Sequence, residues 1–229
     1  MLSVVIGAGD PFDAILHRQT IHHPFNQQTM KNMKIGIIGA GAIGLAFAKT
    51  AATTGHQVTI SNSRGPASLK AIADALPGVT ADTVTAAAQA DIIMLAIPWK
   101  HLDAATAGLP DLSGKIVLDP TNPVIMPGFI LPDLGGKTSS EIVAEKVPGA
   151  NVVKVFNTLQ PSLITTNPQQ HGGRRVVFYS GDSKNAKAVT HRLLESMGFA
   201  GIDLGGLVQG GRMQHFPGGP LAGLHLVQY

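Results

Sequence analysis

The sequence predicts an α/β protein built around a doubly wound, mostly parallel β-sheet. Short runs rich in β-branched residues alternate with segments of helical spacing, which is typical of parallel βαβ units. Several of these runs are apolar on both faces, as expected for strands that helices cover on both sides. With 229 residues and 44% hydrophobic content, the chain can form one such body and a small additional lobe, but not two full domains.

The expected elements alternate along the chain from residue 34 onward. The expected strands are residues 34–38, 57–61, 91–97, 115–119, 151–156 and 175–180. The expected helices are residues 42–55, 66–76, 139–147 and 183–198. The first and last helices end at Gly55 and Gly198, in agreement with the preference for glycine just after a helix.

A glycine-rich turn, GAGAIG at Gly39 to Gly44, follows the first expected strand and opens the first expected helix. In a G-x-G-x-x-G turn, Gly39 permits the tight bend, Gly41 lets the backbone approach a pyrophosphate, and Gly44 allows the helix to pack closely on the strand. Unpaired N–H groups and the helix dipole then stabilise the phosphate charge. The strand–turn–helix context therefore predicts a dinucleotide-binding, Rossmann-type domain.

The second expected strand ends where NAD-binding proteins place an acidic residue on the adenosine ribose. This chain has Asn62, Ser63 and Arg64 there, and the next acid, Asp74, lies too far along. A carboxylate would repel a 2′-phosphate, whereas a guanidinium with hydroxyl and amide neighbours would bind it through charge-assisted hydrogen bonds. The expected cofactor is therefore NADP(H). The alternative is that Arg64 is only a solvated loop residue.

Three domain segments follow from these patterns. Residues 1–33 are polar and without period, and we expect an irregular N-terminal extension. Residues 34–171 form the NADP-binding domain, and residues 172–229 form a small C-terminal α/β lobe. The stretch 205–219 contains too many glycines for a helix, because each glycine lowers helix stability by about 1 kcal/mol relative to alanine.

Composition and charge exclude several classes of function. Without cysteine, the chain has no disulfide, thiolate metal site or cysteine nucleophile. The net charge is only +3 with scattered basic residues, which gives little support for nucleic-acid binding. The chain has no apolar run long enough to span a membrane and no convincing secretory signal, so a cytoplasmic protein is expected. His22 and His23 have no third ligand at a recognisable spacing, so no metal site is expected.

A second ligand would be contacted by residues at the ends of other strands. Asn157 and Thr158 follow the strand at 151–156, where open α/β sheets bind ligands; the alternative is that Asn157 only caps a turn. His101 follows another strand and would contact a ring or ribose, or else lie exposed in the first turn of a helix. Met213, in the glycine-rich stretch, would cover a planar ring.

Seven segments together resemble the coenzyme F420-dependent NADP oxidoreductases, whose fold also occurs in the cytoplasmic domain of the STEAP metalloreductases. The resemblance covers the chain from about Met33 to its end. The segments are KIGIIGAGAIG (34–44), NSRGP (62–66), AIPWKH (96–101), VLDPTNPV (117–124), SSEIVAEKVPGANVVKVFNT (139–158), SGDS (180–183) and GGLVQGGRMQHFPGGPLAGLHLV (205–227).

The resemblance implies an oxidoreductase in which NADP lies across the carboxyl edge of the sheet. A second carrier, coenzyme F420 or a flavin, stacks near the nicotinamide and exchanges a hydride with it directly, so no catalytic acid–base residue is required. The loop after VFNT forms part of the acceptor pocket, and a homodimer is expected. The implied contacts are Gly41, Ala42 and Ile43 with the phosphates, Ser63 and Arg64 with the 2′-phosphate, and Ile97 and Pro98 with the nicotinamide ribose.

The chain departs from the archaeal F420 pattern in two places. It has no lysine soon after Arg64, and its VFNT segment is nearer to the STEAP-like relatives. These departures leave the acceptor open, with a STEAP-like flavin or ferric reductase and a non-catalytic NADPH sensor as alternatives. Hydroxyacid, imine and pyrroline-carboxylate reductases are disfavoured, because only about 70 residues follow Asn157, too few for their helical domain.

Overall fold

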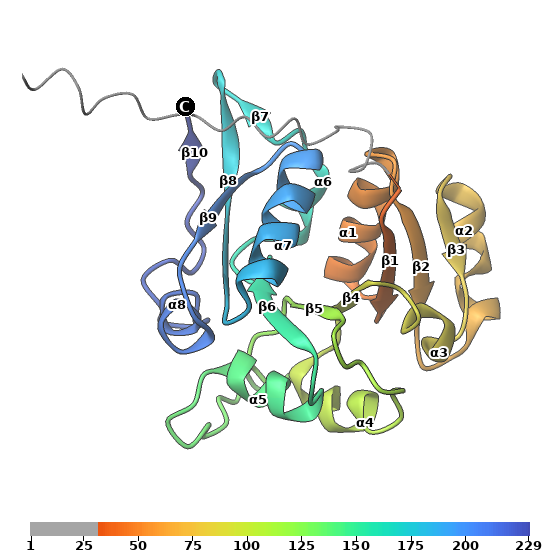
Figure 1. The fold of residues 1–229 in the computed structure, drawn as a ribbon, viewed down its shortest axis with the longest axis horizontal. Helices are drawn as coiled ribbons and strands as arrows, with labels where there is room; N and C mark the ends of the chain where they lie inside the picture. The colour runs from red at the N-terminus through yellow and green to blue at the C-terminus, as the bar shows by residue number, and fades with distance from the viewer. Residues whose placement is uncertain (1–31) are drawn as a thin grey trace, which may run out of the picture.

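The computed structural model describes residues 32–229, which form one ten-stranded sheet flanked by helices (Figure 1). Residues 1–31, with His22 and His23 and nearly all of the expected N-terminal extension, lie outside the described residues. In the part of the chain that is described, no helix has both the length and the apolar character needed to cross a membrane.

The elements follow one another in alternation for most of the chain. The strands are β1 (Lys34–Ile38), β2 (Gln57–Ser61), β3 (Val79–Ala81), β4 (Ile92–Leu95), β5 (Ile116–Asp119), β6 (Asn151–Val155), β7 (Gln169–Gln170), β8 (Gly173–Gly181), β9 (Ala200–Asp203) and β10 (Val227–Gln228). The helices are α1 (Ala42–Thr53), η2 (Pro66–Leu69), α2 (Lys70–Ala75), α3 (Val84–Ala87), η3 (Trp99–His101), α4 (Leu102–Thr106), α5 (Ser139–Lys146), α6 (Pro161–Thr165), α7 (Lys184–Ser196) and α8 (Leu207–Met213).

The strand order confirms the predicted doubly wound sheet. Six parallel strands lie in the order β3-β2-β1-β4-β5-β6, and β8 follows beside β6 in antiparallel orientation. β9 runs parallel to β8, while β7 and β10 pair with it antiparallel. The chain winds in opposite directions from β1 to β2 and from β1 to β4, which opens a crevice at the carboxyl ends of β1 and β4. Residues 172–229, expected as a small C-terminal lobe, contribute three strands, β8, β9 and β10, to this same sheet.

Alternating side chains of the central strands form two large apolar clusters, one on each face of the sheet. In β4, Ile92 and Met94 belong to the cluster that contains α1, α6 and α7, whereas Ile93 and Leu95 belong to the cluster with α3, α4 and α5. Successive residues of a strand point to opposite faces, so a continuous apolar run can supply both cores. Burying each such side chain contributes about 1.5 to 3 kcal/mol.

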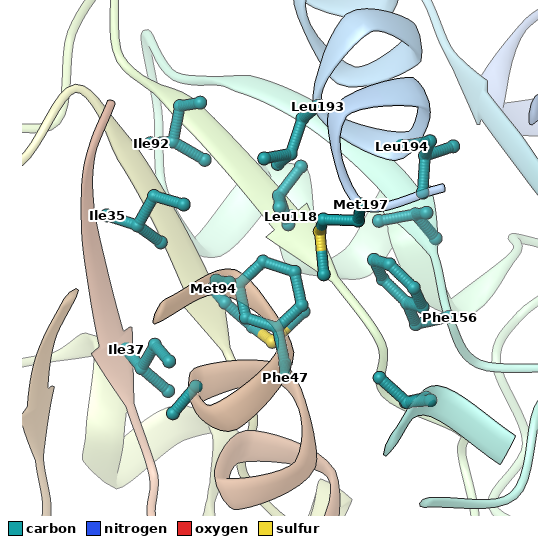
Figure 2. Close-up of a cluster of buried hydrophobic side chains, with 14 of the residues drawn as sticks. Ile35, Ile37, Phe47, Ile92, Met94, Leu118, Phe156, Leu193, Leu194 and Met197 are labelled. Atoms are coloured by element: carbon teal, nitrogen blue, oxygen red, sulfur yellow. The ribbon is translucent and has the colours of Figure 1, made fainter. Parts of the chain in front are cut away.

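Aromatic rings link α1 to the carboxyl end of β6 in the first of these clusters. Figure 2 shows Phe47 and Phe156 among the aliphatic side chains of β1, β4, β5 and α7. The ring centroids of Phe47 and Phe156 lie 5.4 Å apart, and those of Phe156 and Phe199 lie 5.9 Å apart, both in edge-to-face geometry. Phe156 adopts a φ of +65°, a left-handed conformation that costs about 1 to 3 kcal/mol. The packed ring holds this turn in place just before Asn157.

All six expected strands are present within about two residues at each end, and the four expected helical segments are also helical. The expectation for the glycine-rich stretch is wrong, because α8 occupies Leu207–Met213. A Cβ at Gly210 would lie 2.3 Å from the Cβ of Ser180, and one at Gly211 would lie 3.1 Å from the side chain of Thr138. The glycines therefore let α8 pack closely on β8 and on the start of α5, and this packing offsets their low helix propensity.

Candidate functional site

The three glycines of the GAGAIG turn have different surroundings. Gly39 has a φ of +110°, and a Cβ on it would lie 2.1 Å from the carbonyl oxygen of Ala96. A Cβ on Gly44 would lie 2.1 Å from the carbonyl oxygen of Gly39. Gly41, in contrast, has no atom within 4 Å of its Cβ position. Gly39 and Gly44 are thus required by the packing of β1, α1 and β4, whereas Gly41 leaves space open above the turn.

The amino end of α1 faces this open space without a side-chain cap. Gly41 is the N-cap residue, no acidic residue lies in the first turn, and the first intrahelical bond runs from Leu45 N to Gly41 O at 2.9 Å. The N–H groups of Ala42 and Ile43 precede that bond and are not used within the helix. Backbone donors at the positive end of a helix dipole favour an anionic group.

The loop after β2 is shaped by the side chain of Asn62. Its Oδ1 accepts a hydrogen bond from the backbone N of Arg64 at 2.9 Å, and its Nδ2 donates to Ser68 Oγ at 2.9 Å. Ser68 Oγ in turn donates to the carbonyl of Gly65 at 2.8 Å. The amide of Asn62 therefore holds the shape of the loop. The side chains of Ser63 and Arg64 are exposed, and Arg64 forms no ion pair among the described residues.

A cavity of about 640 Å³ joins the glycine turn to this loop. The sequence-predicted residues on its walls are Gly39, Gly41, Asn62, Ser63, Arg64, Ile97, Pro98 and His101. No acidic side chain lines it, so a 2′-phosphate would meet Arg64 without opposing charge. The open space at Gly41, the free N–H groups of α1 and the exposed guanidinium together fit NADP(H). His101 lies in this cavity, whereas Asn157 and Thr158 do not line it.

Asn157 belongs to a buried cluster of three side-chain amides at the carboxyl end of β6. Asn157 Nδ2 donates to Asn122 Oδ1 at 3.0 Å and to the carbonyl of Gln214 at 2.7 Å. Gln214 Nε2 donates to Asn157 Oδ1 at 3.2 Å, and Gln214 Oε1 accepts from Ser180 Oγ at 2.8 Å. Both amide hydrogens of Asn157 are thus used within the protein. Thr158, next to it, is also buried.

A second cavity, of about 470 Å³, opens between residues 123–138 and residues 212–220. Leucine, proline and glycine make up most of its walls, together with Lys137, Arg212 and His215. Burial and, to a smaller extent, the positive charge of Lys154 lower the pKa of His215 below its usual range. Met213 is half-buried at the end of α8 and lines neither this cavity nor the first.

Comparison with known proteins identifies the family. The family model described as NADP oxidoreductase, coenzyme F420-dependent, matches residues 34–123. The crystal structure of a proposed F420-dependent NADP-reductase from Arthrobacter sp. FB24 is 32% identical, with a TM-score of 0.67, and the match covers 77% of this chain and 86% of that one. The chain belongs to the coenzyme F420-dependent NADP oxidoreductase family. Members of this enzyme class are NAD(P)-dependent oxidoreductases, as the sequence predicted.

Other matches extend over different shares of the chain. A hypothetical protein from Sinorhizobium meliloti is 41% identical, with a TM-score of 0.80, and the match covers 89% of this chain and 98% of that one. A glycerol-3-phosphate dehydrogenase [NAD(P)+] from Bradyrhizobium sp. is 34% identical over 128 residues, 51% of this chain and 37% of the relative. The chain thus spans just over a third of the length of the curated relatives it matches.

In this member of the family, a buried ion pair joins β5 to β6. Asp119 Oδ2 and Lys154 Nζ lie 3.5 Å apart, and both side chains are fully buried. Lys154 also donates to the carbonyl of Thr121 at 3.0 Å and to Ser139 Oγ at 2.9 Å, while Asp119 accepts from Thr121 and Ser140. Burial lowers the pKa of Lys154, and the charge of Asp119 opposes that shift. The network fastens the start of the loop after β5 to β6 and to the start of α5.

Several of these residues were not found by sequence reasoning. The loop-building role of Ser68 and the buried Gln214 carry no motif of their own. For Lys154 and Asp119 a signal exists, since each is a charged residue within or ending an apolar strand, and buried charges are normally paired. Among residues 32–229, no group of three or more histidine, aspartate or glutamate side chains is arranged to hold a metal ion.

Proposed function

We propose that this protein transfers a hydride between NADPH and a flavin-like ring carrier, with the deazaflavin coenzyme F420 as the expected acceptor. The observation that carries the proposal is the presence of two cavities on one edge of the sheet. The first follows the carboxyl ends of β1, β2 and β4 and fits a dinucleotide phosphate. The second begins just after β5, at Pro123. Open α/β sheets bind ligands at this edge.

The diphosphate is held by backbone groups of this chain that are already in place. The N–H groups of Ala42 and Ile43 bind the diphosphate above Gly41, and Ser63 and Arg64 bind the 2′-phosphate. The glycine turn is fixed by the packing of Gly39 against Ala96. Such preformed backbone donors bind charge without a reorganisation cost.

The acceptor edge is held by the amide cluster of Asn122, Asn157 and Gln214. Its hydrogen bonds connect the loop after β5, the end of β6 and the end of α8. Lys100 Nζ also donates to the carbonyl of Met126 at 3.3 Å, which links the nucleotide side to the loop that borders the second cavity. When NADPH is bound, its nicotinamide supplies the hydride, so the protein has to align two rings and exclude water.

The relatives support the nucleotide more strongly than the acceptor. The matching family model is described as F420-dependent. A reductive aminase from Aspergillus terreus, solved in complex with NADPH, shares the fold at 21% identity with a TM-score of 0.56. This likeness in fold supports the position of a dinucleotide on the sheet.

Anaerobic mixing of the protein with NADPH and oxidised F420 tests the proposal. We expect enzyme-dependent loss of the visible absorbance of the deazaflavin, matched by oxidation of NADPH in equal amount. FMN and a ferric chelate run in parallel as acceptors. Reduction of FMN or iron without F420 would move the acceptor to the STEAP-like alternative. Binding of NADPH with reduction of no acceptor would contradict the proposal and leave a sensor.

A further inference from the structure

The cavity between residues 123–138 and residues 212–220 combines apolar walls with an uncompensated positive charge. Its cationic lining side chains are Lys137 and Arg212, and no aspartate or glutamate lines it. Lys137 forms an ion pair with Glu145 in which both side chains are about half exposed, and pairs of this kind contribute about 1 kcal/mol or less. Arg212 has no ion pair or side-chain hydrogen bond among residues 32–229.

Arg212 projects from a helix that is held rigidly. α8 lies beside α5 and β8 (Figure 1), and the glycines at 210 and 211 bring it within contact of Ser180 and Thr138. Thr138 Oγ1 donates to the carbonyl of Leu207 at 3.3 Å. Two residues after Arg212, the fully buried Gln214 closes the amide cluster with Asn157. The backbone from which Arg212 extends is therefore fixed, and its guanidinium is exposed to solvent at the cavity.

The same elements connect this cavity to the edge where we place the hydride transfer. Pro123, which lines the cavity, follows Asn122, whose Nδ2 donates to the carbonyl of Asn157 at 3.0 Å. The end of β6 and the cavity that Arg212 lines are therefore adjacent along this edge of the sheet, so a substituent on a ring bound at the end of β6 has a path into the cavity. Apolar walls accommodate the linking chain, and the guanidinium fits a phosphate or phosphodiester oxygen pair.

We propose that Arg212 is a specificity-determining residue that binds an anionic group, a phosphate monoester or phosphodiester, carried on the side chain of the ring acceptor. This inference rests on the proposed function, because it concerns the second substrate of that reaction. We therefore expect the protein to bind a ring acceptor with an anionic side chain more tightly than an acceptor with the same ring and a neutral side chain.

Matched acceptor pairs test the inference by equilibrium binding. FMN and riboflavin share one ring, and F420 and its nucleus without the phosphodiester tail share another. Each is titrated into the full chain saturated with NADP⁺, and ring fluorescence is followed. We expect the anionic member of each pair to bind about five-fold or more tightly, and Arg212→Gln to abolish most of this preference while leaving the neutral member unchanged. If only FMN is preferred over its neutral partner, the group that Arg212 binds is a phosphate monoester. If only F420 is preferred over its neutral partner, the group is a phosphodiester.

The control is Lys184→Gln, which removes the same charge from the exposed start of α7, outside the cavity. It should keep the preference of the unmodified protein. Hydride transfer is then measured with the same acceptors. Arg212-dependent binding without reduction would support this inference and overturn the proposed function. If both members of each pair are reduced and bind with equal affinity, or if Arg212→Gln keeps the preference, the role of Arg212 is overturned while the proposed function stands. Binding of no acceptor would overturn both.

Discussion

The diphosphate end of the nucleotide cavity is built from backbone groups, whereas the amide cluster at the end of β6 is built from side chains that are far apart in the sequence. In the first region, a glycine turn and the N–H groups of α1 lie within ten residues of one another. In the second, Asn122, Asn157 and Gln214 come from three separate segments and meet only in the folded chain. The difference predicts that substitutions at buried polar side chains affect mainly stability, whereas substitutions at Gly41 and Arg64 affect mainly nucleotide affinity.

The largest effect is expected for Lys154→Met. Removing one partner of a buried pair leaves the other charge uncompensated, so the free energy of unfolding should fall by about 3 to 5 kcal/mol. Urea denaturation measures this loss. The paired variant Lys154→Met with Asp119→Leu should recover much of it, since the unpaired charge is then gone. NADPH affinity of the folded fraction should stay near that of the unmodified protein, and a parallel loss of affinity would show that the two regions are not separate.

Arg64→Ala should act on nucleotide affinity alone. The loss of charge-assisted bonds to the 2′-phosphate should weaken NADPH binding by about 1.5 to 3 kcal/mol, and NADH binding should hardly change. Isothermal titration calorimetry measures both, with Lys70→Ala, on the exposed face of α2, as the control for a lost surface cation. Equal losses for the two nucleotides would remove Arg64 from the 2′-phosphate site.

Two alanine substitutions in the glycine turn should separate packing from binding. At Gly41 the added methyl meets no protein atom, so stability should change by less than about 0.5 kcal/mol, while NADPH binding weakens by about 1 to 3 kcal/mol through overpacking. At Gly39 the methyl meets Ala96 in a left-handed backbone, so stability itself should fall. Thermal unfolding and titration of both variants provide the comparison, and a stability loss at Gly41 would contradict it.

The smallest effect concerns His56, at the opposite end of the sheet. Its ring is buried, Nε2 lies 2.9 Å from Ser196 Oγ, and Nδ1 has no partner. Burial lowers its pKa below the ordinary 6.5, so the unfolded chain binds the proton more readily and stability falls as pH drops below about 6.5. The stability difference between the unmodified protein and His56→Gln should therefore shift in favour of His56→Gln between pH 7.5 and pH 5. If this stability difference does not change with pH, the pKa of His56 is the same in the folded and unfolded states, which would contradict the prediction.

The same contrast explains how much could be predicted from the sequence. The strands, most helices and the cavity at Gly39 to Gly44 depend on local patterns: β-branched runs, helical spacing and glycines at fixed offsets. Arg64 could be singled out because its place is defined by distance from the glycine turn. The amide cluster could not, because a hydrogen bond between Asn157 and Gln214 depends on how β6 and α8 pack.

The helix α8 shows the limit most clearly. The low helix propensity of its glycines predicted no helix here, yet these glycines allow α8 to approach Ser180 and Thr138 closely. Tertiary packing outweighed local preference here, and no pattern within residues 205–219 reveals the partner surfaces. The role of His101 also depends on packing, since its strand-end position predicted a ring or ribose contact, and the fold places it on the wall of the nucleotide cavity.

The proposed reaction is direct hydride transfer between two rings at the carboxyl edge of the sheet. NADPH carrying deuterium at C4, in separate pro-R and pro-S forms, is reacted anaerobically with oxidised F420. We expect one of the two forms to deliver its deuterium to C5 of the reduced deazaflavin, where carbon-bound hydrogen does not exchange with water. Reduced F420 without deuterium from either form would contradict direct transfer and require an intermediate carrier.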